Sequence, residues 1–355
     1  MYKYLLLILM GLSTHLQAQN SVTLSGEISD AANGESLIGA TLYIEELGEG
    51  VITNVYGFYS ITLSPGTYNV IISYVGFDSQ SQLLTLDQNT KRNVELRESD
   101  KELEAVTVSA EREDANVTNL EMSTSRLDIK SVLKTPSFAG EVDIIKSIQL
   151  LPGVSTVGEG ASGFNVRGGG VGQNLVLLDE APVYQTSHLF GFFSVFNPDA
   201  VKDVKLYKGG IPAQYGGRIS SILDVRMKEG NNKNFEVGGG VGTVFSRIAI
   251  EGPMVKEKAS FILAGRRSYA DVLARPFTDI FDNGAALYFY DLTAKANWNV
   301  GDKDRVYLSG YFGRDVFKFD ARQGFDWGNN TGTLRWNHLF NDRLFSNFTW
   351  VYSNY

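Results

Sequence analysis

The chain has 355 residues, with 32 lysines and arginines against 40 aspartates and glutamates, so its formal net charge is −8. An acidic chain repels the phosphate backbone, which argues against nucleic acid as a partner. The sequence contains no cysteine and three histidines. This composition excludes disulfide bonds, thiolate metal sites, a cysteine nucleophile and histidine-rich metal sites. We therefore predict no cofactor.

The first residues have the features of an export signal. Lys3 precedes an apolar run from Tyr4 to Leu12, and Ala18 supplies the small residue of a cleavage site. The run is about half as long as a membrane-spanning helix requires. We predict that residues 1–18 are a signal peptide and that the rest of the chain is exported. The alternative, a buried helix, leaves Lys3 and Ala18 unexplained.

Residues 19–97 show the period-two alternation of β-strands. Val22 and Leu24 share one face of the first predicted strand, and the pattern returns in Ile38–Ile44 and Tyr59–Leu63. Ser64–Thr67 is predicted to form a turn between two of these strands. Short strands spaced about ten residues apart, with turn residues between them, predict a compact β-sandwich.

The same segment resembles the carboxypeptidase-regulatory-like module. The resemblance is carried by Ser25–Ile28, Ile38–Thr41, Thr53–Tyr59 and Pro65–Tyr68. It implies a non-catalytic sandwich used for spacing or partner contact. A zinc peptidase site is excluded because no histidine lies between Asn20 and Gln185. A generic immunoglobulin-like stalk is the alternative.

Residues 98–119 are rich in charge and lack a sustained period, which predicts a flexible linker. The linker contains one β-prone island, formed by Ala105, Val106, Thr107, Val108 and Ser109. A segment of this kind can add a strand to the edge of another protein's sheet. Such islands are common in linkers, so the residues alone assign no partner.

Residues 120–230 combine a predicted helix at Glu141–Leu151 with short strands and glycine-rich turns. The glycines do not form a nucleotide loop, because Gln173 stands where a dinucleotide-binding motif needs its third glycine. The chain also contains no Gly-Lys-Ser/Thr phosphate loop and no Gly-x-Ser-x-Gly elbow. Nucleotide binding and a serine hydrolase are therefore not predicted.

Four runs of this segment resemble the plug domain of TonB-dependent outer-membrane receptors, of the Bacteroidetes type that also carries the sandwich module. They are Leu151–Val154, Asn165–Gly169, Leu178–Tyr184 and Lys208–Arg218. The chain has Asp179-Glu180 where the large glycan-importing SusC-like branch usually has an Asp-Gly turn. That departure argues against a polysaccharide substrate.

The resemblance implies roles for particular residues. Ala105–Ser109 is similar to the TonB box, the segment to which TonB adds a strand. The residues of the plug motifs, which we assign to gating, are Arg167, Gly168, Gly169, Asp179, Gly209, Gly216, Gly217 and Arg218. For the glycines, tight turns are the main expected role. For Arg167 and Arg218 we expect ion pairs with carboxylates of a barrel lumen.

Tyr184–Phe193, at the end of the plug's third motif, is predicted to form a loop that we call the apical loop. Its candidate substrate contacts are Tyr184, His188, Phe190, Phe192 and Phe193. Packing of the phenylalanines against a barrel wall is the alternative, and the sequence leaves both open.

Residues 231–355 have the pattern of outer-membrane strands. They contain 24 of the 42 aromatic residues and all four tryptophans. The face of Ala286–Val300 that holds Leu292, Ala294 and Ala296 is apolar, whereas the opposite face is polar. Tyr290 and Trp298 bracket the apolar face, about 26 Å apart along a strand and about 19 Å once the strand is tilted. That height approaches the apolar band of a membrane barrel with its aromatic borders.

Similar patterns predict six further strands. They are Phe235–Thr243, Val244–Glu251, Ala259–Arg267, Arg305–Phe319, Asn330–Phe340 and Arg343–Tyr355. Gly301–Lys303 and Asn341-Asp342 are expected as tight turns and Ser268–Ala285 as a long loop. Seven strands are about a third of a 22-stranded barrel, and an open edge in lipid leaves backbone groups unpaired. We therefore expect the chain to be the amino-terminal part of a longer receptor.

The predicted fold is mainly β: a β-sandwich, an α/β plug domain and the first strands of a truncated 22-stranded antiparallel transmembrane β-barrel. The expected function is TonB-dependent import of a scarce ligand, siderophore-like or another small organic molecule, by a protein that is not an enzyme. The expected partners are TonB, outer-membrane lipid and the ligand. The expected location is the outer membrane, with the N-terminal domain in the periplasm. The alternative is an exported β-sandwich adhesin or glycan-binding surface protein.

Overall fold

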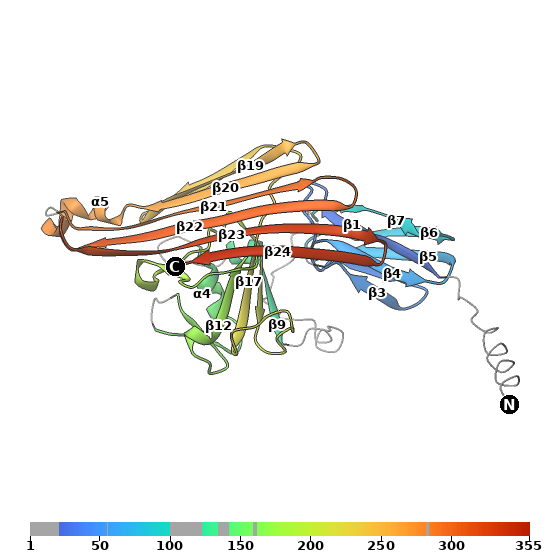
Figure 1. Ribbon diagram of the computed structural model, residues 1–355, viewed down its shortest axis with the longest axis horizontal. Coiled ribbons are helices and arrows are strands. Elements are labelled where there is room, and N and C mark those ends of the chain that lie inside the picture. The colour runs from blue at the N-terminus through green and yellow to red at the C-terminus, as the bar shows by residue number, and fades with distance from the viewer. Residues whose placement is uncertain (1–20, 55, 100–122, 134–141, 159–161, 282–283) are drawn as a thin grey trace, which may run out of the picture. The chain divides into compact units, whose positions relative to one another are not determined.

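The computed structural model describes residues 21–54, 56–99, 123–133, 142–158, 162–281 and 284–355 (Figure 1). These residues form two compact units, one built chiefly from the described residues before 100 and one chiefly from those after 122. The predicted signal peptide and the predicted TonB box at Ala105–Ser109 lie outside the described residues.

The first unit is a β-sandwich, as predicted. One sheet has the order β4-β1-β7, with β8 pairing a second part of β1, and the other has the order β3-β2-β5-β6. The strands are β1 (Val22–Asp30), β2 (Thr41–Ile44), β3 (Glu49–Ile52), β4 (Phe58–Leu63), β5 (Gly66–Ser73), β6 (Gln80–Leu86), β7 (Thr90–Lys91) and β8 (Val94–Leu96).

The sandwich core follows the alternation of its strands. Leu24 and Ile28 of β1 are fully buried together with Leu42 and Ile44 of β2. These side chains point inward because successive residues of a strand face opposite sides of the sheet. The predicted turn joins β4 to β5, and the Tyr68 hydroxyl donates a hydrogen bond of 2.8 Å to the Ser64 carbonyl oxygen beside it.

The second unit begins with a middle domain built around a mixed five-stranded sheet of order β13-β12-β17-β16-β9. The strands are β9 (Thr124–Asp128), β12 (Asn174–Leu178), β13 (Ala181–Pro182), β16 (Val201–Tyr207) and β17 (Ser221–Met227). β12 pairs with β17 in parallel, whereas β16 is antiparallel to both of its neighbours.

Two short helices accompany this sheet, α3 (Ile129–Leu133) and α4 (Ile144–Gln149). α4 lies within the predicted helix, and its Ile144, Ile145 and Ile148 are fully buried in the domain core. Asp143 caps the helix by accepting a hydrogen bond of 3.1 Å from the Lys146 N–H. A second Asp143 oxygen accepts the Ser194 N–H at 2.7 Å, which fixes the apical loop to the helix.

Two small antiparallel ladders complete the domain. β10 (Val154–Thr156) pairs with β11 (Phe164–Val166), and β14 (Ser187–His188) pairs with β15 (Phe193–Ser194). The second ladder encloses one 3-10 turn, Leu189–Gly191, in which all three residues have positive φ. Two of those residues carry a side chain, a conformation that costs about 1–2 kcal/mol each. The apical loop is thus a sharp and strained turn.

Seven antiparallel strands follow in simple order, β18 to β24. They are β18 (Glu236–Val241), β19 (Phe245–Val255), β20 (Ala259–Ser268), β21 (Ala286–Asn299), β22 (Asp304–Lys318), β23 (Gly324–Asn341) and β24 (Leu344–Asn354). All seven predicted strands are present. β23 begins six residues before the predicted start at Asn330, because Gly324 pairs with Lys318 and Phe325 with Phe317.

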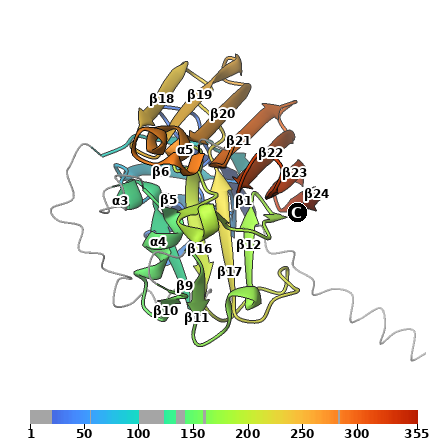
Figure 2. The same cartoon turned by 90° about the vertical axis from the view of Figure 1, so that its left-hand side faces the viewer.

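The middle domain lies against one face of this sheet (Figures 1 and 2). That face is polar. Asp291, Thr293, Lys295 and Asn297 of β21 are at most 5% exposed, whereas Leu292 and Trp298 on the opposite face are 47% and 55% exposed. The predicted division of β21 into two faces is confirmed. A sheet of this kind buries polar side chains and exposes apolar ones, the reverse of a water-soluble sheet.

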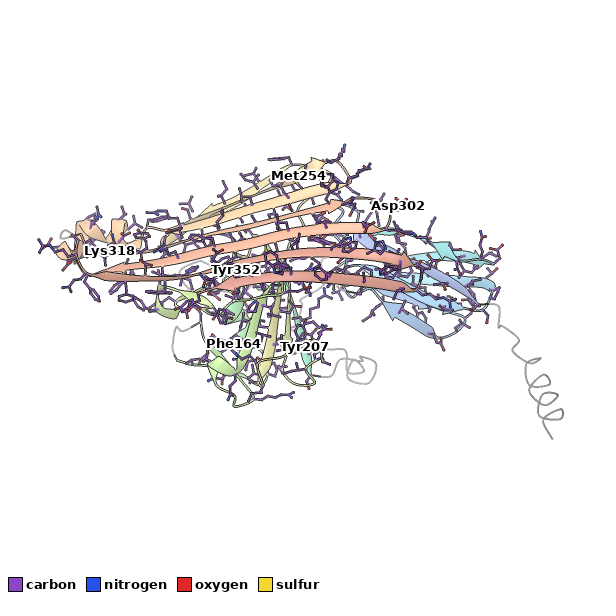
Figure 3. All side chains as sticks on the ribbon, in the orientation of Figure 1. Phe164, Tyr207, Met254, Asp302, Lys318 and Tyr352 are labelled. Atoms are coloured by element: carbon purple, nitrogen blue, oxygen red, sulfur yellow. The ribbon has the colours of Figure 1, made fainter. Side chains whose placement is uncertain are left out.

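The connections differ between the two ends of the sheet. Residues 256–258 and 300–303 form tight links at the end marked by Met254 and Asp302 (Figure 3). The opposite end, marked by Lys318, carries the long link of residues 269–285, with α5 (Ala270–Ala274) and two 3-10 turns. The predicted tight turn and long loop are thus confirmed.

No helix among the described residues is both long enough and apolar enough to cross a membrane.

The sandwich yields one test of its packing. A Cβ atom on Gly26 would overlap the Arg92 carbonyl oxygen, and the Arg92 N–H donates to the Ser25 carbonyl at 2.7 Å, so the two segments cannot separate freely. Gly26→Ala is expected to destabilise the sandwich by about 1–3 kcal/mol. Hydrogen exchange of peptides from residues 22–30 measures the loss. Leu83→Ala, at an exposed position of β6, is the control, and equal exchange in the two variants would contradict the packing.

Candidate functional site

The candidate site is the polar interface between the middle domain and the seven-stranded sheet. It begins at the two-residue turn Asp179-Glu180 between β12 and β13, where φ is 47° and 74°. Turns with positive φ at both central residues favour Asn-Gly or Asp-Gly. Glu180 stands where glycine is favoured, and its side chain makes the positive φ unfavourable. Contacts with the rest of the protein therefore have to stabilise the turn.

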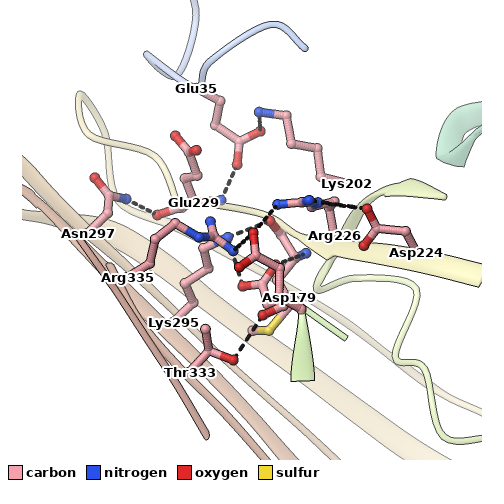
Figure 4. Close-up of polar contacts among 12 residues, drawn as sticks. Glu35, Asp179, Lys202, Asp224, Arg226, Glu229, Lys295, Asn297, Thr333 and Arg335 are labelled. Carbon is pink, nitrogen blue, oxygen red and sulfur yellow. Dashed lines mark hydrogen bonds and ion pairs between the residues drawn. The ribbon is translucent and has the colours of Figure 1, made fainter. Parts of the chain in front are cut away.

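Asp179 supplies several of these contacts from a fully buried position. One carboxylate oxygen accepts the Met227 N–H at 3.0 Å, and the other lies 2.9 Å from the Lys295 ammonium (Figure 4). Lys295 also donates to the Met227 carbonyl at 3.0 Å, and the Thr333 hydroxyl donates to the Asp179 carbonyl at 2.9 Å. The turn is therefore joined to both β21 and β23.

Asp179 is held in its ionised form. Burial alone would raise the pKa of its carboxyl group, but the charges of Lys295 and Arg335 and the Met227 N–H outweigh burial and lower that pKa below the usual 3.8. The resulting stabilisation is present above pH 3.8 and is lost as the pH falls through the lowered pKa. The turn is thus held by a charged carboxylate at neutral pH.

Glu180 bridges two arginines. Its carboxylate lies 3.3 Å from Arg226 of β17 and 3.1 Å from Arg335 of β23. Arg226 also contacts the Asp224 carboxylate at 3.1 Å, which the Tyr215 hydroxyl approaches at 3.3 Å. A buried charge needs an opposite charge nearby, and each charged side chain of this network has one.

A second buried cluster surrounds His188 of β14. Its Nδ1 lies 2.7 Å from Asp315 of β22, and its Nε2 lies 3.2 Å from both Asp291 of β21 and the Tyr311 hydroxyl. The His188 ring stacks on Phe289 with 4.3 Å between centroids. The other Asp315 oxygen accepts the Leu189 N–H at 2.8 Å.

Arg266 of β20 continues this cluster. Its guanidinium contacts Asp291 at 2.6 Å and donates to the Ser194 carbonyl at 3.0 Å. It also lies over the rings of Phe245 and Phe289, 5.7 Å from each centroid. A sheet residue thereby binds the backbone of the apical loop directly.

Aromatic rings gather where the apical loop meets the hairpin of β22 and β23. Phe190 lies within 5.2 to 6.3 Å of the rings of Phe317, Phe325 and Trp327, and Phe319 lies 4.7 Å from Phe317. Phe190, Phe319 and Phe325 are exposed. We call Phe190, Phe317, Phe319, Phe325 and Trp327 the aromatic cluster.

The predicted substrate contacts divide into two groups. Tyr184, Phe190 and Phe192 are exposed, whereas His188 and Phe193 are buried against the seven-stranded sheet. Phe193 packs on Phe245 with 5.2 Å between ring centroids.

The glycine motifs form turns. Gly168 and Gly217 have φ near 80°, and a Cβ on Gly169 would overlap Ser220. Gly209 lies against the Arg167 guanidinium, whereas a Cβ on Gly216 would meet open space.

The two predicted gating arginines do not join the interface. Arg167 donates to the Ser123 hydroxyl at 3.1 Å, and Arg218 donates to the Gly217 carbonyl at 2.9 Å. Within the described residues, neither forms an ion pair with a carboxylate of the seven-stranded sheet. Arg226 of the middle domain and Arg266, Lys295 and Arg335 of the sheet provide the cations instead.

Sequence reasoning did not assign the sheet residues to a site. The relevant signal was present, since Asp291 and Lys295 stand on the polar face of a strand whose other face is apolar. Charges at such positions require partners inside the barrel. No cluster of three or more acidic, histidine or cysteine side chains suited to a metal ion is found in the part of the chain that the structure describes.

Residues 130–221, which contain this turn, the apical loop and most of the middle domain, match the TonB-dependent Receptor Plug Domain family. The chain carries a TonB-dependent receptor plug domain. Residues 24–108 match the CarboxypepD_reg-like domain, which covers the sandwich. A search of curated proteins finds no match to the chain.

Several solved receptor structures are similar to this chain. The siderophore receptor PirA from Acinetobacter baumannii aligns with a TM-score of 0.51 at 16% identity, over 68% of this chain and 40% of that receptor. PirA from Pseudomonas aeruginosa gives 0.48 at 18% identity, over 65% and 40%. The ferric enterobactin receptor PfeA from the same species gives 0.47 at 15% identity, over 68% and 41%. The chain spans about 40% of the length of these receptors.

The ion pair between the plug and the sheet gives a test. Lys295→Met should reduce the free energy of unfolding by about 3–5 kcal/mol, because it leaves Asp179 buried without its cation. Denaturant unfolding of the detergent-solubilised protein measures the change. Lys303→Met, in the exposed turn between β21 and β22, is the control. The double variant with Asp179→Asn should recover stability relative to Lys295→Met, and additive losses would contradict direct pairing.

Proposed function

We propose that the chain acts in TonB-dependent import of a scarce small molecule across the outer membrane. One observation carries this proposal: a plug domain is held, through the ion pairs Asp179–Lys295 and Glu180–Arg335, on the polar face of strands whose other face is apolar. The combination suits a polar lumen occupied by a plug and surrounded by lipid. The proposed location is therefore the outer membrane.

The apolar face approaches the height of a membrane band. Across β20, β21 and β22, one row contains Arg267, Tyr290 and Arg314 in register, and Trp298 lies eight residues further along β21. This span corresponds to about 26 Å of strand and about 19 Å when tilted. We propose that these rows mark the two borders of the lipid.

The unequal connections set the proposed orientation. Outer-membrane barrels have short periplasmic turns and long external loops. The links at residues 256–258 and 300–303 would then be periplasmic, and the link at residues 269–285 external. The proposed place of the sandwich and of the linker at residues 98–119 is the periplasm.

The proposed coupling segment is Ala105–Ser109. TonB would add a strand to this segment, with each new backbone hydrogen bond contributing about 0.5–1.5 kcal/mol. Energy supplied through TonB would then move the plug away from the seven-stranded sheet. The chain's own contribution is binding and displacement, with no catalytic step.

The proposed ligand contacts are the exposed side chains of the apical loop, Tyr184, Phe190 and Phe192. Phe190 belongs to the aromatic cluster, and Tyr184 and Phe192 lie in the same loop. His188 and Phe193 are buried against the sheet and hold the loop in place. Aromatic rings favour a ligand with flat apolar groups. We propose that the ligand is a siderophore-like or other small organic molecule. The similar structure PirA is described as a siderophore receptor.

The coupling segment is tested by Val106→Pro. Proline removes one backbone donor and prevents regular strand pairing, so the variant should lose at least about tenfold in affinity for the TonB C-terminal domain. Titration calorimetry with the detergent-solubilised protein measures that affinity. Thr107→Val, which keeps the donor and favours strands, is the control. Equal affinity in wild type and Val106→Pro would refute the assignment, and the same substitution in the producing bacterium should abolish uptake.

The membrane band is tested by Leu263→Arg. Leu263 is exposed near the middle of the apolar face, where arginine should cost about 2–4 kcal/mol. Trp298→Arg, at the other border, lies opposite the uncharged Ala259 and Val306 and should cost about 0–1 kcal/mol. The amount of each variant in the outer-membrane fraction measures the effect. Equal recovery of both variants would argue for a face that does not meet lipid.

A further inference from the structure

We infer that His188 anchors the plug to the seven-stranded sheet as a doubly hydrogen-bonded imidazolium, so that one proton controls how firmly the apical loop is held. The inference deepens the proposed function, because it treats the plug as a part that must leave the sheet. It concerns a positioning residue and no chemical step.

Geometry requires two donors on the His188 ring. Nδ1 faces a carboxylate oxygen of Asp315 at 2.7 Å, and Nε2 faces one of Asp291 at 3.2 Å. Ionised carboxylates only accept hydrogen bonds, whereas a neutral imidazole donates from one nitrogen alone. A neutral ring would therefore direct a lone pair at a buried carboxylate. Only the imidazolium satisfies both contacts.

The surrounding charges favour the same proton. The ring is 2% exposed and is faced by Asp291 of β21 and by Asp315 and Tyr311 of β22. Arg266 of β20 balances one of these carboxylates. Without the proton, the immediate cluster of two carboxylates and one guanidinium would keep a net negative charge in a buried site, which is costly.

The next charges around the cluster lie on α4. Asp143 accepts the Ser194 N–H at 2.7 Å, and the Lys146 ammonium lies 5.8 Å from the Phe193 ring. Asp143 and Lys146 carry opposite charges, so together they do not change the net charge around His188. The pKa of His188 is shifted accordingly: burial lowers it, but the hydrogen bonds and charges of Asp291 and Asp315 outweigh burial and raise it above 6.5.

A second arrangement exists for the neutral ring. Tyr311 Oη lies 3.2 Å from Nε2, so its hydroxyl can donate to that nitrogen once the proton has left. Nδ1–H then keeps Asp315, and the bond to Asp291 is lost. Asp291 remains paired with Arg266 at 2.6 Å. Deprotonation thus removes one of the two bonds between the His188 ring and the sheet carboxylates without leaving either nitrogen unpaired.

The direction of the pH effect follows from the raised pKa. The stabilisation by His188 is complete below pH 6.5, the ordinary pKa of histidine, and is lost as the pH rises through the higher pKa of the folded protein. The apical loop should therefore open more readily in alkaline solution. Because Phe190 of the aromatic cluster stands two residues further along, the anchor adjoins the proposed ligand contact.

The protonation state can be measured without any substitution in the site. Nitrogen NMR of the detergent-solubilised, ¹⁵N-histidine-labelled protein should show both ring nitrogens of His188 carrying protons at pH 6.5. The signals are assigned by their loss in His188→Gln and their retention in His338→Gln. A neutral imidazole spectrum for His188 at pH 6.5 would overturn the inference.

The anchoring role is tested by hydrogen exchange of residues 187–194, corrected for the intrinsic effect of pH. Protection should fall about tenfold or more as the pH rises through the pKa of His188 found by an NMR titration, in wild type and in His338→Gln, because a charge-assisted bond is lost. It should be low and independent of pH in His188→Gln. An equal pH dependence in His188→Gln would refute the anchor. Neither readout involves TonB or uptake, so a failure here is distinct from a failure of the import proposal.

Discussion

Charge pairing in a buried interface is the constraint on which the second unit depends. Asp179, Lys295, Asp291 and Arg266 are all buried, so each needs an opposite charge within a few ångströms. Asp291 and Arg266 pair within the sheet, whereas Asp179 and Glu180 of the plug pair with Lys295 and Arg335 of the sheet. The plug therefore does not satisfy its own charges completely. The two parts are held in one register because any shift would leave a buried charge unpaired.

This constraint also explains the inverted sheet. The face that meets the plug has to be polar, since ion pairs and hydrogen bonds provide its contacts. The other face is free of that requirement and is apolar, with aromatic residues at its borders. An interface of this kind is specific in register, yet polar contacts can be exchanged for water when the parts separate. Such an interface suits a plug that is held firmly and still removed.

Much of the architecture was predictable from the sequence. The alternation around Leu292 and Trp298 identified the faces of β21, and the turn residues near Pro65 placed a sandwich hairpin correctly. The early start of β23 was missed because Gly324 and Gly328 weaken the apolar pattern there. Their strand conformation comes from pairing with β22, which a local pattern does not contain.

The partners within the site were less accessible to sequence analysis. His188 and Asp315 are separated by 127 positions, so no spacing rule connects them. The glycine motifs drew attention to Arg167 and Arg218, but the structure uses Arg226 and Arg335 around Glu180. Local motifs reveal turns, whereas a buried ion pair depends on the meeting of distant strands. A charged residue on the polar face of an otherwise apolar strand was the one available signal.

β9 has a mechanical consequence under the proposed function. It is the edge strand of the plug sheet and the first described strand after the coupling segment. Five residue pairs with β16 hold it, together with the ion pair of 2.6 Å between Arg126 and Asp203. A load applied from the periplasm would reach this ladder before any other strand. Detachment of a single edge strand could therefore open a path while the central strands stay folded.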